Sequence, residues 1–137
     1  MTVTELFDEF DALEDWEERC EFLIDLGFDL PEMPPETKTE ENRVHGCQSN
    51  VWLIAEANES IPPEITYIAD SDAMIVKGLI AILLAVYSGR TSQEVLDADI
   101  KTIFSRLGLD RHLSPSRRNG LNGMVERIRS IARNVAS

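Results

Sequence analysis

The chain has 137 residues, of which 43% are hydrophobic, and its 25 acidic and 13 basic side chains give a formal net charge of −12. This length and apolar content are typical of one core, so we expect a single domain over residues 1–137. The negative total disfavours nucleic acid or an anionic membrane as a partner. The acidic, amphipathic start does not have the pattern of a secretory signal, and the two cysteines are expected to be free thiols in a cytoplasmic protein.

The charges are unevenly distributed along the chain. Residues 1–41 hold 15 acidic side chains against only Arg19 and Lys38, whereas from Lys101 onward there are 8 basic and 2 acidic residues. Such runs are usually solvated helix faces, and a docking surface for a charged partner is the alternative. The sequence therefore predicts an acidic N-terminal face and basic C-terminal helices.

Two amphipathic helices are predicted first. Apolar residues recur at helical spacing over residues 3–13 and again over residues 16–26, and Gly27 is expected to end the second helix. Cys20 falls on the apolar side of that helix, where a small buried thiol is the expected role. Three prolines then exclude a continued helix, so residues 28–42 are predicted to form a connector that wraps the surface.

Strand patterns follow the connector. A short strand is expected at Arg43 and Val44, a second over residues 50–57, where branched and aromatic side chains alternate, and a third over residues 65–69 after a Pro-Pro turn. These patterns predict a small three-stranded antiparallel sheet.

The rest of the chain is predicted to be helical. Residues 72–88 are almost continuously apolar but fall short of the ~20 residues that a membrane span needs, so they predict a buried core helix that Ser71 or Asp72 caps. Shorter helices are expected over residues 91–98 and 100–107. The last helix is expected to begin at Ser114 or Ser116, and its apolar residues share one face: Leu121, Met124, Val125, Ile128 and Ile131. Strands flanked by helices indicate an α+β domain, with the sheet packed against several helices.

Cys47 is the candidate reactive residue. It follows Gly46, which permits a positive φ, and it precedes the clearest strand, so its thiol is expected in the loop before that strand. The backbone N–H groups of Gln48 and Ser49 could stabilise a thiolate if this turn forms an anion-binding nest. No Cys-x-x-Cys or Cys/His spacing accompanies it, so no metal site is predicted.

Four blocks of sequence resemble the SufE-type sulfur acceptors of the Suf iron-sulfur assembly system. Residues 43–53 read Arg-Val-His-Gly-Cys-Gln-Ser-Asn-Val-Trp-Leu and resemble the cysteine-loop signature of that family. Residues 71–79 are similar to the start of its long helix, residues 109–117 to the approach to its last helix, and residues 119–121 to the beginning of that helix. The resemblance covers nearly the whole chain and implies the SufE/IscU-like fold.

The resemblance also implies a function. Cys47 would take the terminal sulfur of a persulfide from a SufS-type cysteine desulfurase, and would deliver it to a SufBCD-type iron-sulfur cluster scaffold. The pyridoxal phosphate of that reaction would belong to the desulfurase, so no cofactor is expected on this chain. The protein would then be a sulfur-transfer partner and an activator more than an independent enzyme.

Several residues are expected to support Cys47. The resemblance places Arg117 near the cysteine loop as a cation, although it could instead cap or solvate the last helix. The stretch that holds Asp72 and Lys77 would also lie near the loop and near the partner, where Asp72 is expected to be a helix cap and Lys77 to neutralise an acidic neighbour or to reach the surface. His45 could take the proton of Cys47, but a loop-packing role is favoured.

Two other functions are possible alternatives. A thiol hydrolase would pair Cys47 with His112, which requires the fold to bring distant segments together. An iron-sulfur scaffold would need several thiolates, and the chain offers only Cys20 and Cys47 without a ligand spacing.

Overall fold

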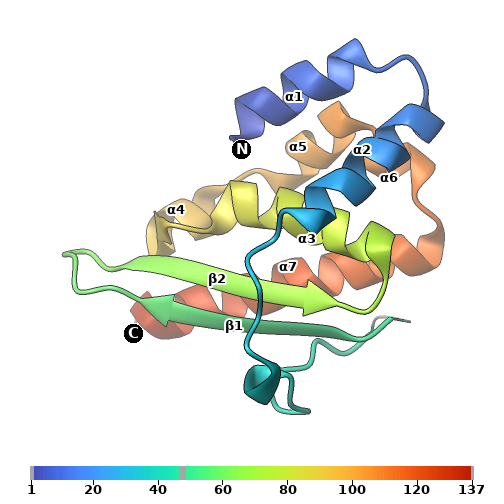
Figure 1. Ribbon diagram of the computed structural model, residues 1–137. Coiled ribbons are helices and arrows are strands. Elements are labelled where there is room, and N and C mark those ends of the chain that lie inside the picture. Colours follow the sequence, from blue (N-terminus) through green and yellow to red (C-terminus); the bar gives the residue numbers. More distant parts are fainter. Residues whose placement is uncertain (1, 47–48, 137) are drawn as a thin grey trace.

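The structure is a computed structural model, and it describes residues 2–46 and 49–136. Figure 1 shows β1 and β2 side by side in one layer, with α7 behind them, α3 above β2, and the N-terminal helices α1 and α2 at the top of the view, on the side of α3. The described elements, in chain order, are α1 (Val3–Ala12), α2 (Trp16–Phe28), the 3-10 helix η1 (Pro35–Thr37), β1 (Val51–Ala57), β2 (Glu64–Ser71), α3 (Met74–Tyr87), β3 (Arg90–Thr91), α4 (Ser92–Asp97), α5 (Ile100–Leu107), α6 (Leu109–His112) and α7 (Pro115–Ala136).

The sheet has the order β1-β2-β3 and is antiparallel, as the sequence predicts. One predicted strand is wrong, because Arg43 forms only an isolated bridge with Trp52. The N–H of Val44 donates to the carbonyl of Val51 at 2.8 Å, but the chain turns immediately afterwards and the pairing stops. The third strand is instead Arg90–Thr91, which is too short to show an alternating pattern and whose second residue, Thr91, is predicted to start a helix.

Close packing of α2 against α3 forms the centre of the core. The approach depends on two glycines: a Cβ atom at Gly78 would collide with the backbone carbonyl of Leu23, and one at Gly27 would lie 2.7 Å from the Cβ of Lys77. Gly27 therefore does not end α2, which continues to Phe28. Its role is to let two helix backbones come together, which helical periodicity does not reveal.

Helix ends agree with the predictions in part. Helix α5 spans the predicted range and ends at Gly108, whose φ of 77° allows the left-handed cap. Helix α4 begins with a capping box between Thr91 and Glu94. The predicted core helix is confirmed as α3, but its predicted cap is wrong, because the N-cap is Ala73 without a side-chain hydrogen bond. The hydroxyl of Ser71 instead accepts from the N–H of Ala73 at 3.2 Å, just before the helix.

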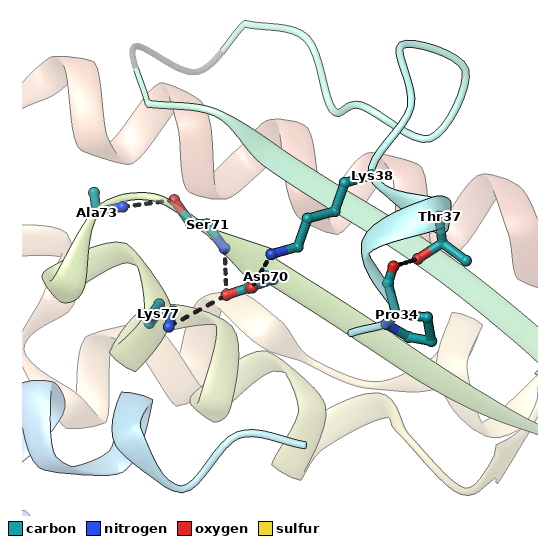
Figure 2. A network of polar contacts seen from close by, with 7 residues as sticks. All are labelled: Pro34, Thr37, Lys38, Asp70, Ser71, Ala73 and Lys77. Atoms are coloured by element: carbon teal, nitrogen blue, oxygen red, sulfur yellow. Dashed lines mark hydrogen bonds and ion pairs between the residues drawn. The ribbon is translucent and has the colours of Figure 1, made fainter. Parts of the chain in front are cut away.

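A polar network holds the predicted connector on the sheet. Asp70 of β2 accepts from Lys38 at 2.8 Å and from the N–H of Ser71 at 2.8 Å, and it forms an ion pair with Lys77 of α3 at 3.5 Å, as Figure 2 shows. The ammonium group of Lys38 also lies 5.5 Å from the ring centroid of Trp52. One carboxylate thus fastens the connector, a central strand and the core helix together.

Candidate functional site

The structure describes the predicted reactive loop up to Gly46 and again from Ser49. Cys47 and Gln48 themselves lie outside the described residues, so the predictions made for them stay predictions. Gly46 has a φ of 91°, which confirms the expected left-handed conformation at that position. Ser49, where the description resumes, is half-buried. These two residues fix where the loop leaves and rejoins the domain.

Ser49 lies on the wall of a small cavity between α3 and α7. The cavity has a volume of about 60 Å³, and its lining is mostly apolar, with contributions from Val76 and Leu79 of α3 and from Leu121 and Met124 of α7. The guanidinium-bearing residue in the lining is Arg117, which was predicted to lie near the loop. The fold thus brings together two segments that are far apart in the sequence, and it leaves between them a space with room for a few atoms.

The N-terminal end of α7 gives this cavity a positive character. Ser114 precedes the helix, and its hydroxyl accepts from the N–H of Arg117 at 3.3 Å, so Ser114 is the cap that the sequence predicted as one of two candidates. Ser116 and Arg117, which both line the cavity, are therefore in the first turn of a 22-residue helix. The helix dipole and the Arg117 charge both favour an anion there.

Asp72 holds the chain directly after the loop. Its carboxylate accepts from the backbone N–H of Asn50 at 3.1 Å and from the Asn50 side chain at 2.9 Å. The N–H of Asp72 donates in return to the carbonyl of Asn50 at 3.4 Å. Asp72 is thus a clamp between the start of β1 and the turn before α3, and the prediction that it caps the helix is wrong. The pairing spans 22 residues, so no local pattern could show it.

His45 and Lys77 do not line the cavity. The imidazole of His45 is 68% exposed and lies 3.6 Å from the carboxylate of Glu40, so it faces solvent and an acidic neighbour. Lys77 contacts Asp70, which confirms the expected pairing with an acid. The backbone of His45 nevertheless lies next to α7. A Cβ atom at Gly123 of that helix would be 3.4 Å from the His45 carbonyl oxygen.

The second cysteine and the second histidine lie along α2. His112 stacks on Trp16, with ring centroids 4.8 Å apart and planes inclined by 13°, and it is not part of the cavity lining. Cys20 is half-buried. Burial raises the pKa of the Cys20 thiol, and this effect outweighs the lowering by the Arg117 charge and by a hydrogen bond with Trp16. The influence of Arg117 on this thiol was not foreseen from the sequence.

The described residues show neither a cluster of metal ligands nor a helix suited to a membrane. Over residues 2–46 and 49–136, no three His, Cys, Asp or Glu side chains gather as metal ligands would. Within the same part of the chain, no helix is both long enough and apolar enough to cross a membrane.

The fold and the site define a class of protein: a small α+β domain in which Ser49, where the chain resumes after residues 47–48, lines a cavity at the positive end of a long helix. The chain matches the family described as "SufE: Fe-S metabolism associated domain" over residues 4–132, and it belongs to this SufE family, which is associated with iron-sulfur metabolism.

Two relatives agree with this assignment, and a solved structure shares the fold. The chain is 44% identical over 132 residues to an uncharacterised SufE-like protein of Rhizobium meliloti, covering 96% of this chain and 94% of that protein. It is also 44% identical over 133 residues to an uncharacterised SufE-like protein of Rhizobium etli, covering 96% and 90%. The solution structure of a hypothetical protein from Thermus thermophilus shares the fold, with a TM-score of 0.77, 22% identity and coverage of 99% and 98%.

Proposed function

We propose that this protein accepts sulfur on Cys47 from a cysteine desulfurase that uses pyridoxal phosphate, and that it passes the sulfur to a scaffold on which iron-sulfur clusters are built. The coenzyme belongs to the desulfurase, and the protein acts as its acceptor and activator. Membership of a family associated with iron-sulfur metabolism supports this proposal. The desulfurase and the scaffold are what the resemblance to SufE-type sulfur acceptors implies.

The transfer step is a thiol exchange without net oxidation. Cys47 first loses its proton, and its thiolate attacks the terminal sulfur of the persulfide on the desulfurase. A new S–S bond forms on Cys47 while the S–S bond of the partner breaks. The bonding electron pair leaves with the cysteine thiolate of the partner, and Cys47 then carries the transferred sulfur as a persulfide.

One observation carries the proposal: Ser49, two residues after Cys47, and Arg117 line the same cavity. A thiolate or a persulfide anion next to this cavity would gain from the charge of Arg117 and from the positive end of α7. The cavity, with a volume of about 60 Å³, has room for the added sulfur atom. The Asn50–Asp72 clamp holds the chain near this position.

Mass spectrometry of the intact protein tests the proposal. The protein is incubated with a cysteine desulfurase and cysteine, and then its mass is measured with and without a reductant. We expect the wild type to gain the mass of one sulfur atom, reversibly, and Cys47→Ser to gain none. Cys20→Ser is the matched control and should gain sulfur like the wild type. Equal labelling of Cys47→Ser, or no labelling of any variant, would refute the proposal.

The role of Arg117 is tested in the same assay. We expect Arg117→Gln to slow sulfur acceptance about tenfold, because removing one nearby charge changes thiolate stability by roughly one pKa unit. The neighbouring Arg118 donates to the carbonyl of Asp110 and is not among the residues that line the cavity, so Arg118→Gln serves as the control. An equal rate of sulfur acceptance in Arg117→Gln and Arg118→Gln would show that Arg117 is not part of the proposed site.

A further inference from the structure

A second group of cationic side chains lies away from the cavity, around the turn between α5 and α6. A Cβ atom at Gly108 would lie 3.3 Å from Nη1 of Arg19, 3.5 Å from Nη2 of Arg111 and 3.4 Å from Cδ2 of His112. Gly108 has a φ of 77° and no side chain, which lets these three groups approach its backbone closely. Three groups from two separate elements, α2 and the end of α6, thus meet at one position.

The two guanidinium groups are close together without a carboxylate between them. Arg19 uses Nη2 to donate to the carbonyl of Phe10 at 3.1 Å, which leaves Nη1 directed to the side of Gly108. Within the described part of the chain, neither Arg19 nor Arg111 has a carboxylate partner at ion-pair distance. Asp11 is the acid whose pKa responds to Arg19, but both of its oxygens are taken by Arg106, at 2.7 Å each.

This arrangement is unusual for a chain with so many acids. Residues 1–41 carry 15 acidic side chains, and yet two arginines lie within 3.5 Å of one point with no carboxylate paired to either among the described residues. The two like charges repel one another, and an anion that receives hydrogen bonds from both would remove the repulsion. The planar fork of each guanidinium matches a carboxylate or a phosphate, and a single oxyanion that accepts from both would link α2 to α6.

We propose that Arg19, Arg111 and His112 form a binding site for an oxyanion, a carboxylate or a phosphate group. Arg19 is half-buried and held by Phe10, so it is the fixed side of the site, whereas Arg111 is exposed and free to close over the ligand. His112 adds a ring edge that its stack on Trp16 holds in place. The site is separate from the cavity at Ser49, and the proposal does not depend on sulfur transfer.

The chain provides its own reporter for this site. Its two tryptophans are Trp16, whose ring stacks on His112, and Trp52, which lies in β1 under Lys38. The two indole N–H signals in a nitrogen-proton correlation NMR spectrum therefore distinguish the site from the sheet. An anion that contacts His112 and Arg111 changes the surroundings of Trp16 and leaves those of Trp52 unchanged.

The test is a titration of the full chain with inorganic phosphate, followed by the Trp16 signal at constant ionic strength. We expect a saturable shift in the wild type and an affinity about tenfold weaker in Arg111→Gln, because one charged donor is lost. Lys101→Gln removes an equal charge from an exposed position on α5 and should bind like the wild type. A shift that does not saturate, or equal affinities for Arg111→Gln, Lys101→Gln and the wild type, would overturn the proposal.

A second titration identifies the source of the oxyanion. A short peptide of alternating glutamate and glycine replaces phosphate, and the same variants are compared. Tighter, Arg111-dependent binding of the peptide would assign the site to carboxylates of a protein partner, and tighter binding of phosphate would assign it to a small free anion. Binding of either ligand with the same affinity in the wild type and in Arg111→Gln would count against the site itself.

Discussion

The carboxylate of Asp72 receives two hydrogen bonds from Asn50, one from its backbone N–H and one from its side chain. Asn50 is the last residue before β1, and Asp72 lies between β2 and α3. The clamp therefore fixes the chain that leaves the cysteine loop to the turn that starts the core helix. Asp72 does not line the cavity, but it holds in place the segment that contains Ser49, which does.

Loss of this clamp should impair sulfur transfer more than folding. We expect Asp72→Ala to lower the free energy of unfolding by about 1 kcal/mol or less, since the hydrogen bonds are exposed. The rate of sulfur acceptance should fall several-fold, because Ser49 and Asn50 lose their fixed position. Rates from the desulfurase assay and urea denaturation measure the two effects. Asp97→Asn, which also removes an exposed carboxylate, should change neither, and a normal rate in Asp72→Ala would contradict this role.

The left-handed conformation of Gly46 predicts a cost for any side chain there. Gly46 and Gly89 both have a positive φ and open space around the position of a Cβ atom, so alanine costs only backbone strain, about 1–2 kcal/mol at either site. We expect Gly46→Ala and Gly89→Ala to be destabilised to a similar degree in urea, while only Gly46→Ala accepts sulfur more slowly. Equal transfer rates would show that the backbone at Gly46 does not position the loop.

The contact between α2 and α3 predicts a large difference between two glycine substitutions. Gly78→Ala should lower the free energy of unfolding by about 3 kcal/mol or more, because its Cβ would collide with the Leu23 carbonyl group, whose carbon it would approach to 2.6 Å. Gly123→Ala in α7 meets its nearest atom at 3.4 Å and should gain about 0.5–1 kcal/mol from helix propensity. Urea denaturation of both variants checks the pair, and similar stabilities would refute the packing argument.

Asp70 should make the stability depend on pH. Burial would raise the pKa of its carboxyl, but hydrogen bonds from Lys38 and from the Ser71 N–H, together with the charge of Lys77, outweigh that effect and lower it. A lowered pKa stabilises the folded state above the unfolded value of about 3.9, and the stabilisation is lost as the pH falls through the folded value.

Asp70→Asn tests this dependence. We expect it to be less stable than the wild type by about 1 kcal/mol at neutral pH, with the difference shrinking as the pH falls from about 4 to about 2. Urea denaturation along a pH series gives both curves. Asp97→Asn is the control for the general loss of a carboxylate. A difference that stays constant through the acid range would exclude the Asp70 network as its cause.

Cys20 should report the charge of Arg117 independently of sulfur transfer. Burial raises the pKa of the Cys20 thiol and Arg117 partly opposes it, so Arg117→Gln should raise that pKa further. In a Cys47→Ser background, the rate of alkylation by iodoacetamide follows the thiolate fraction, and its midpoint should move to higher pH in Arg117→Gln. Arg118→Gln should leave the midpoint unchanged. An alkylation midpoint of Cys20 that is the same with and without Arg117 would show that the Arg117 charge does not lie near this thiol in solution.

The sequence predicted most helices well and the sheet less well. Helix α5 was placed correctly because its apolar residues repeat at helical spacing between a cap and Gly108. The prediction of the third strand is wrong for two reasons. The strand β3 has only two residues, and the predicted strand at Arg43 forms only one bridge. Gly27 has the local pattern of a helix stop, since a glycine required by packing and a glycine that ends a helix look alike in the sequence.

The amino-acid sequence by itself determined the α+β class, the family resemblance, the positive φ at Gly46 and the choice of Cys47, because periodicity, turn chemistry and motif spacing are properties of neighbouring residues. Only the tertiary structure decided which distant residues meet. The cavity shared by Ser49 and Arg117, the clamp between Asn50 and Asp72, and the convergence of Arg19 and Arg111 on Gly108 all join separate elements. Such pairings depend on how helices pack around the sheet, and local sequence carries no record of that packing.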